Sequence, residues 1–221
     1  MYCFILIMNL RPIAITTALM LALAASAVAS PIEYTSRAAF DAASTTTLID
    51  FEAQNPGGAN GINGSYSSLT IGDVTFSQPN TRLFVLGSAV YNTYGSSYLN
   101  HNDLSTGNVT ITFANAVTAM GFDLGYLYPW NGNGNLMLTL SNGDVFSIDH
   151  NELVNFANPF SFWGVTTETA FTWAVIDDPT KGTAIDNFAF GANSAVPDGG
   201  SILGLFGAAL AALAVIRRRQ A

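Results

Sequence analysis

Carboxylates are the most numerous side chains in this sequence that could do chemistry. Asp50 and Glu52 end an expected strand over residues 48–52, and their spacing of two should project both to the same face. Asp186 lies in the last expected strand, 185–190. If the first and last strands meet, Glu52 and Asp186 could share a structural calcium ion, because Ca²⁺ prefers hard oxygen ligands. Alternatively, both carboxylates accept hydrogen bonds from loop backbone, and the sequence leaves these alternatives open.

Few combinations of residues in this sequence are typical of a catalytic site. Glycoside hydrolysis needs only two carboxylates, but fourteen acidic residues between positions 30 and 195 make chance pairs unavoidable. The two histidines, His101 and His150, lack any spacing typical of a transition-metal site. No Gly-x-Ser-x-Gly sequence marks a nucleophilic serine. We therefore expect a protein without catalytic activity of its own, with a glycan-acting hydrolase as an alternative.

Residues 126–134 combine aromatic rings with amides and read Tyr-Leu-Tyr-Pro-Trp-Asn-Gly-Asn-Gly. Flat rings beside amide donors and acceptors are typical of sugar-binding surfaces, so Tyr126, Tyr128 and Trp130 are candidate sugar contacts. The alternative is that these rings plug the end of a β-sandwich. Trp163 and Trp173 lie inside strand patterns, so we expect both in the core.

The elements that position these residues are mostly short strands. One helix is expected over residues 35–44, capped by Thr35 or Ser36 and anchored by Phe40. Asn142-Gly143 predicts a type I′ hairpin turn. The absence of a second helical pattern predicts a single all-β domain, an antiparallel β-sandwich of jelly-roll type. The expected strands are 48–52, 69–71, 74–77, 83–86, 109–113, 119–124, 136–140, 145–148, 160–165, 171–176 and 185–190.

Charge excludes one class of partner. Between residues 30 and 195 the basic residues are Arg37, Arg82 and Lys181, so this body carries about −11 and should repel nucleic acid. The one cysteine, Cys3, precedes the body, which therefore has no disulfide and no thiolate chemistry.

The N-terminal end is typical of an export signal. Arg11 precedes an apolar run over residues 13–25, and Ala27-Val28-Ala29 has the small residues of a cleavage site. We expect residues 1–29 to be a cleaved signal peptide that starts at Met1 or Met8. The alternative is an uncleaved N-terminal membrane helix.

The C-terminal end, residues 196–221, has three consecutive parts. Val196-Pro197-Asp198-Gly199-Gly200 precedes an apolar run over residues 201–216. A basic cluster follows: Arg217, Arg218 and Arg219. Sixteen helical residues reach only about 24 Å, short of a hydrocarbon core of about 30 Å, although arginines can snorkel to close part of the gap. They also predict a cytoplasmic C-terminus.

This tail resembles the PEP-CTERM sorting signal, in particular its variant with a Val-Pro-Asp-Ser/Gly motif. The resemblance implies that residues 196–200 are recognised by exosortase, an integral-membrane processing enzyme, and that the inner membrane is a temporary location. The body also resembles a type recurrent among PEP-CTERM surface proteins, on loose patterns at residues 38–40, 49–52, 121–124, 162–165 with Phe171, and 185–188.

Together, the ends and the body predict an exported, exosortase-processed protein of the cell surface or extracellular matrix. Its body, residues 30–195, is expected to be a β-sandwich that carries no catalytic site. The alternative is that the body is a carbohydrate-binding jelly-roll module that acts on extracellular polysaccharide.

Overall fold

A computed structural model describes residues 30–55, 57–78, 82–88, 96–102, 107–126, 135–149, 160–178, 183–194 and 207. Residues 30–194 form one compact unit, the body. Its helices are α2 (Arg37–Ala43) and two 3₁₀ turns, η1 (Glu52–Gln54) and η2 (Gly58–Asn60). Its strands are β1 (Ile32–Tyr34), β2 (Ser44–Ile49), β3 (Ile62–Tyr66), β4 (Ser68–Ile71), β5 (Val74–Ser77), β6 (Arg82–Leu86), β7 (Tyr98–Asn102), β8 (Gly107–Tyr126), β9 (Leu136–Leu140), β10 (Val145–Ile148), β11 (Phe160–Asp178) and β12 (Thr183–Asn193).

Two long strands, β8 and β11, take part in both layers of the body. Their first and second halves pair with different neighbours, and every ladder is antiparallel. The first layer runs β4-β5-β8-β11-β9-β10, using the start of β8 and the end of β11. The second layer runs β1-β11-β8-β12-β7-β6-β3, with β2 beside the end of β12. The predicted antiparallel β-sandwich is confirmed.

The core lies between these layers. Phe76 of β5 meets Phe188 of β12 with ring centroids 5.2 Å apart, and Phe146 of β10 meets Trp163 of β11 at 5.6 Å. Each pair joins one layer to the other. Because alternate residues of a strand face opposite sides, these strands bury one face and leave the other to solvent or to a covering element.

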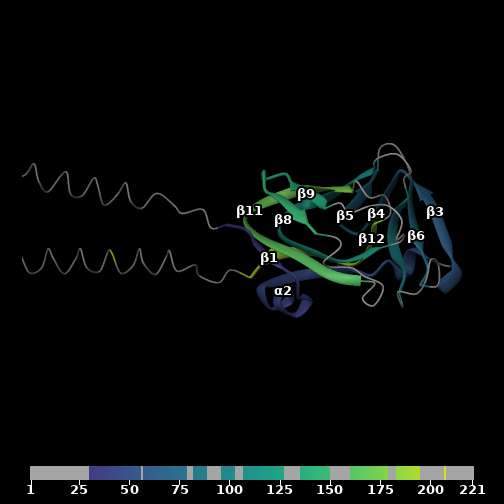
Figure 1. The fold of residues 1–221 in the computed structure, drawn as a ribbon, viewed down its shortest axis with the longest axis horizontal. Coiled ribbons are helices and arrows are strands. Elements are labelled where there is room, and N and C mark those ends of the chain that lie inside the picture. Colours follow the sequence, from purple (N-terminus) through teal and green to yellow (C-terminus); the bar gives the residue numbers. More distant parts are fainter. Residues whose placement is uncertain are drawn as a thin grey trace, which may run out of the picture. The chain divides into compact units, whose positions relative to one another are not determined.

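Helix α2 covers the outer face of the second layer (Figure 1). The Ser36 hydroxyl caps it by accepting a hydrogen bond from the Ala39 amide at 3.4 Å, and Phe40 is fully buried against Phe162. The predicted helix, its cap and its anchor are therefore confirmed.

Several sequence predictions need correction. Runs 109–113 and 119–124 belong to the single strand β8, and 160–165 and 171–176 to β11. Strands β1, β3 and β7 were not predicted. Strand β2 ends at Ile49, and Phe51 adopts a positive φ of 59°, so the argument that Asp50 and Glu52 share a strand face is wrong.

The hairpin between β9 and β10 is confirmed, but its turn is not type I′. Among the residues of this turn only Gly143 has a positive φ, 98°, and its amide donates to the Leu140 carbonyl at 3.0 Å. Leu140 in turn donates to the Asp144 carbonyl at 2.9 Å. This geometry is that of a type I turn closed by a glycine bulge, in which glycine alone takes the left-handed conformation.

Candidate functional site

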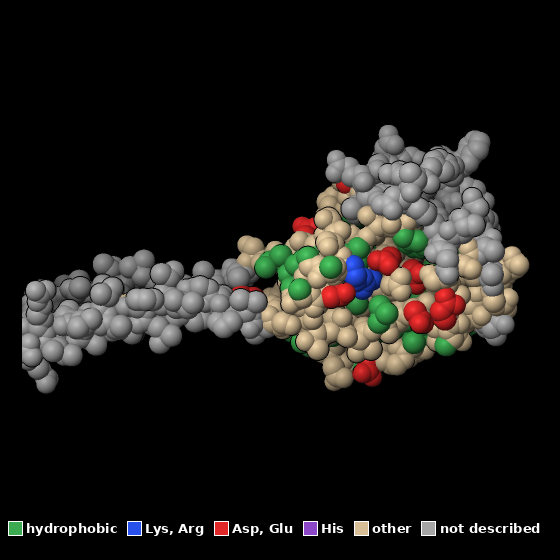
Figure 2. Space-filling model, turned by 90° about the horizontal axis from the view of Figure 1, so that it is seen from below, with side chains coloured by type: hydrophobic (Ala, Val, Ile, Leu, Met, Phe, Trp, Pro, Cys, Tyr) green, Lys and Arg blue, Asp and Glu red, His purple; other side chains and the backbone are tan. Residues whose placement is uncertain are grey.

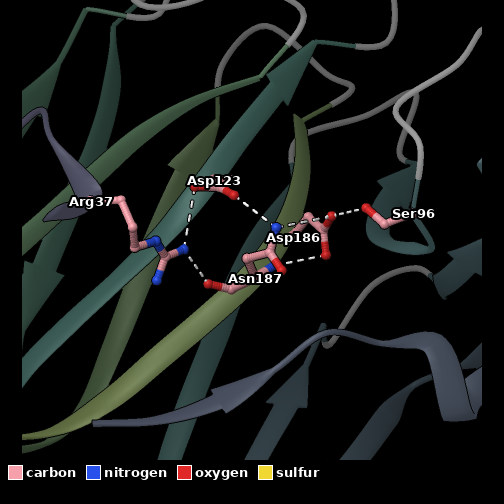
Figure 3. A network of polar contacts seen from close by, with 5 residues as sticks. All are labelled: Arg37, Ser96, Asp123, Asp186 and Asn187. Carbon is pink, nitrogen blue, oxygen red and sulfur yellow. Dashed lines mark hydrogen bonds and ion pairs between the residues drawn. The ribbon is translucent and has the colours of Figure 1, made fainter. Parts of the chain in front are cut away.

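A network of polar side chains lies at the edge between α2 and the second layer (Figure 3). The Arg37 guanidinium donates to Asp123 Oδ1 at 3.2 Å and to the Asn187 carbonyl at 2.5 Å. The side-chain amide of Asn187 donates to Asp123 Oδ2 at 2.8 Å and to Asp186 Oδ2 at 3.4 Å. The Ser96 hydroxyl also donates to Asp186. The network thus links helix α2, strands β8 and β12, and the segment before β7.

A bulge in β12 makes this arrangement possible. Asp186 pairs with Asp123 across the ladder, and the register shifts between Asp186 and Ala189. Asn187 within the bulge has a φ of 46°, a conformation that asparagine tolerates better than most residues. Its carbonyl and its side-chain amide therefore both reach the polar network.

Arg37 is held by more than its ion pair. Its guanidinium lies 4.4 Å from the centre of the Phe162 ring, and it meets the Asp123 carboxylate with side-chain exposures of 27% and 24%. Because both partners are partly in solvent, the ion pair alone contributes little, and the ring and carbonyl contacts add to it. On the face shown in Figure 2, basic atoms gather in one small area with acidic side chains near it.

Asp186 is the buried acid of the network, with an exposed fraction of 1%. Burial raises the pKa of Asp186 from 3.8 to about 6, because desolvation penalises the carboxylate. Hydrogen bonds from Ser96 and the Asn187 backbone oppose this rise, whereas the charges of Asp123 and Glu52 add to it. An acid with a raised pKa is a typical catalytic candidate, but a 1% exposed carboxylate has no access to substrate.

Glu52 makes contacts of its own with the segment before β7. Its Oε1 accepts from the Ser97 backbone amide at 2.7 Å, and its Oε2 accepts from the Ser97 hydroxyl at 2.9 Å. Asn55, 5% exposed, donates to the same hydroxyl at 3.2 Å. Glu52 is therefore tied to the residue that follows Ser96, the partner of Asp186.

Glu52 and Asp186 are the residues that the sequence predicts to hold calcium. The first long strand, β2, does lie beside the last, β12, as expected. Glu52 accepts from the backbone amide and the hydroxyl of Ser97, and Asp186 accepts from the hydroxyl of Ser96, so only the Ser97 amide is a backbone donor of the kind that the alternative expected from this segment. Within the described ranges no group of three or more His, Cys, Asp or Glu side chains could hold a metal ion. Calcium at Glu52 and Asp186 stays a prediction.

Other expected site residues lie outside the described part of the chain. These are Val196, Pro197, Asp198, Gly199, Gly200, Arg217, Arg218, Arg219, Tyr128, Trp130, and the side chain of Tyr126. Among the residues that are described, no helix is long and apolar enough to cross a membrane.

Sequence reasoning did not identify most of this network. Arg37, Ser96, Asp123 and Asn187 come from four separate segments, and no local motif joins them. One signal was present: Arg37 is one of only three basic residues in an acidic body, so a carboxylate partner could be expected. Trp163 is buried as predicted, at 2% exposed, whereas the prediction that Trp173 lies in the core is wrong. Trp173 is 38% exposed.

Three solved structures show a distant similarity to the chain. A CBM29-2 point mutant shares 14% identity at a TM-score of 0.37, covering 67% of this chain and 94% of its own. A CBM29-2 mutant complexed with mannohexaose shares 14% at 0.33, covering 67% and 93%. A structure described as carbohydrate binding module family 29 shares 13% at 0.33, covering 67% and 90%. These similarities are too low for a ligand or a site to be transferred.

The C-terminal end gives a specific match. No curated protein is significantly similar in sequence to the chain. The model of the VPDSG-CTERM motif, however, matches residues 195–220. In this chain the motif reads Val-Pro-Asp-Gly-Gly at residues 196–200, with Gly199 in place of serine, ahead of the apolar run and the arginines. Residues 195–220 therefore carry a VPDSG-CTERM motif, a variant of the PEP-CTERM type of C-terminal sorting signal.

Proposed function

We propose that this chain is an exported protein that exosortase processes at its C-terminal tail and that resides at the cell surface or in the extracellular matrix. The observation that carries the proposal is the VPDSG-CTERM motif at residues 195–220. The Ala27-Val28-Ala29 sequence after an apolar run supports export, because it has the parts of a signal peptide. The sandwich body is the cargo and has no catalytic activity of its own.

The physical chemistry of the tail supports temporary membrane residence. Its apolar run of sixteen residues is shorter than a typical hydrocarbon core, and the three arginines hold the far end in the cytoplasm. Pro197 disfavours helix in the residue before it, and Gly199-Gly200 add backbone freedom, so the sequence of the motif favours an extended, accessible segment. A processing enzyme in the membrane needs such an accessible segment.

Fractionation in the native host tests this proposal with three forms of the chain. The full chain should be found at the surface, with a mature C-terminus near residues 196–200 by mass spectrometry. A form that lacks residues 196–221 should lose surface attachment. A form with Pro197→Leu and Asp198→Leu keeps the apolar run and the arginines, and it should accumulate unprocessed in the inner membrane. Surface delivery of the truncated form at the level of the full chain would contradict the proposal.

A second candidate function for the body is binding of extracellular polysaccharide. The observation that favours it is the clustering of Tyr126, Tyr128 and Trp130 with asparagine and glycine in residues 126–134. Aromatic rings offer flat apolar faces to sugar rings, and amides hydrogen-bond to their hydroxyls. Polysaccharide pull-down by the full chain, compared with Trp130→Ala, tests whether residues 126–134 contribute.

A further inference from the structure

The outer face of the first layer carries straight rows of side chains that run across the strands. Its first row contains Thr70 of β4, Thr75 of β5, Thr112 of β8 and Trp173 of β11, each directly opposite the next. The residues between them along the strands, such as Phe76, are buried in the core, so the row faces outward. We call this outer surface the Trp173 face.

A second row lies beside the first and crosses six strands. It contains Ser68, Ser77, Thr110, Val175, Thr139 and Val145, again each opposite the next. Neighbouring strands are about 4.8 Å apart, so this row extends for about 24 Å. The face is therefore long enough for several consecutive units of a chain-like ligand.

Trp173 is on this face because β11 has an irregularity beside it. Phe171 is buried, and a residue two positions later should face the same side. The register of β11 against β8 shifts between Phe171 and Trp173, which turns the indole outward. Its side chain is 38% exposed, and Val145 is 55% exposed. Large apolar groups are thus presented to solvent among hydroxyls.

The two rows form a neutral hydrogen-bonding surface, and the nearest charge along β11 is Asp177, which lies two residues after Val175 and faces the same side. Serine and threonine hydroxyls both donate and accept, as in the 2.9 Å contact between Thr70 Oγ1 and Thr75 Oγ1. The two rows contain no charged residue, although the body as a whole carries about −11. An uncharged partner can approach this face without opposition. Anionic polymers, and a second copy of the same acidic body, are repelled by the surrounding charge.

The two layers differ in what covers them. Phe40 of helix α2 is packed on the outer face of the second layer, where it buries Phe162 and Ala189. Figure 1 shows α2 on one side of the body and β9, a strand of the Trp173 face, on the other. The exposed fractions of Trp173 and Val145 show that the first layer is open to a partner at these positions.

We propose that the Trp173 face binds an uncharged polysaccharide, which lies along the hydroxyl rows with a sugar ring against the Trp173 indole. Sugar hydroxyls can exchange hydrogen bonds with threonine and serine, and the apolar face of a sugar ring can stack on an indole. This inference deepens the second candidate function, on which it rests, by placing the ligand on a sheet face instead of at residues 126–134.

Affinity electrophoresis and intrinsic fluorescence of the full chain, in a detergent without a sugar headgroup, test the inference. The neutral probes are a soluble β-glucan, a galactomannan and dextran, and the anionic probe is alginate. We expect at least one neutral probe to retard the chain and alginate not to. Trp173→Ala should weaken binding about tenfold or more, as for a central aromatic contact. Thr112→Val, which removes one hydroxyl at nearly constant volume, should weaken it less.

A matched control is Leu48→Ala, which removes an exposed apolar side chain (56% exposed) from β2 in the second layer and should leave binding unchanged. Thermal melting shows that each variant is folded. The inference fails if no neutral probe binds, if alginate binds as well as the neutral probes, or if Trp173→Ala binds normally. Binding that is lost in Trp130→Ala but kept in Trp173→Ala supports the second candidate function and overturns the inference. Concentration-dependent dimerisation that Trp173→Ala abolishes, without polysaccharide binding, assigns the face to a second copy instead.

Discussion

Asp186 and Asp123 lie directly opposite each other on β12 and β8, and the side-chain amide of Asn187 donates to both carboxylates, at 3.4 and 2.8 Å. Two carboxylates in this position repel each other unless one is protonated or both are compensated. Arg37 compensates Asp123, and burial favours the protonated form of Asp186. The pair therefore couples the stability of the body to pH.

Substitution of Asp186 by asparagine should reduce the pH dependence of unfolding. Burial raises the pKa of Asp186 to about 6, so between pH 4 and 6 the folded chain holds a proton that the unfolded chain has released. Stability then falls as pH rises through this window and levels off above it, by about 3 kcal/mol for a shift of about two units. Asp186→Asn keeps an acceptor and removes the charge. Denaturant unfolding at pH 4, 5, 6 and 7 should show a flatter profile for this variant, and the exposed Asp41→Asn should retain the original slope.

Removal of the Arg37 guanidinium should destabilise the body by about 1–3 kcal/mol, because a carbonyl hydrogen bond and a ring contact are lost with the ion pair. Arg37→Met keeps the aliphatic stem and isolates the loss of the charged group. Arg37→Lys should recover only part of the loss, because an ammonium lacks the planar donors that reach both partners. The control is Arg82→Met at the exposed start of β6. Equal melting temperatures for Arg37→Met and the unmodified chain would contradict this account.

Replacement of Gln78 by methionine should stabilise the fold. Gln78 is 1% exposed, and both polar atoms of its amide lack a hydrogen-bond partner in the part of the chain that the structure describes. A buried amide without partners lowers the free energy of unfolding by about 1–3 kcal/mol. A methionine of similar length has no amide and avoids this cost. Calorimetry should show a higher melting temperature for Gln78→Met, while the half-buried Gln54→Met should change it little. A lower melting temperature for Gln78→Met would indicate that a water molecule solvates the amide.

Addition of a methyl group at Gly191 should separate β2 from β12. A Cβ there would lie 2.2 Å from the Thr45 carbonyl oxygen, which is backbone and can yield only if the strand shifts. Overpacking of this kind costs about 1–3 kcal/mol. Gly191→Ala should therefore lower the melting temperature, whereas Ala192→Ser, at the exposed position next to it, should not. An unchanged melting temperature for Gly191→Ala would show that β2 can shift to make room for the methyl group.

The fold class could be predicted from the sequence because most strands keep a regular alternation. β5, β9 and β10 were predicted with the bounds that the structure shows, since each is short and ends at turn residues. For β8 and for β11, by contrast, the alternation predicts two separate strands in place of one. Their alternation breaks at the corner where they pass between layers, and a broken alternation is indistinguishable in sequence from a loop.

The polar network could not be predicted for a related reason. It depends on a bulge at Asn187, and the separate contacts of Glu52 follow a left-handed Phe51. Neither residue type indicates a positive φ as strongly as glycine does. The contacts also join residues far apart in the chain, such as Arg37 and Asn187. The pairing of the first long strand with the last was expected, and it did bring Glu52 and Asp186 to segments that are neighbours.

The position of β12 has a mechanical consequence under the proposed attachment of the chain through its tail. Any pull on the C-terminal end enters the body at Ser194, whose amide is bonded to the Ala43 carbonyl at 2.9 Å, and is passed directly to β12. That strand is bonded on one side to β8 and on the other to β2 and β7. A force along the strand must shear these ladders together, since their hydrogen bonds lie perpendicular to it. These ladders would therefore resist a force applied at Ser194 together.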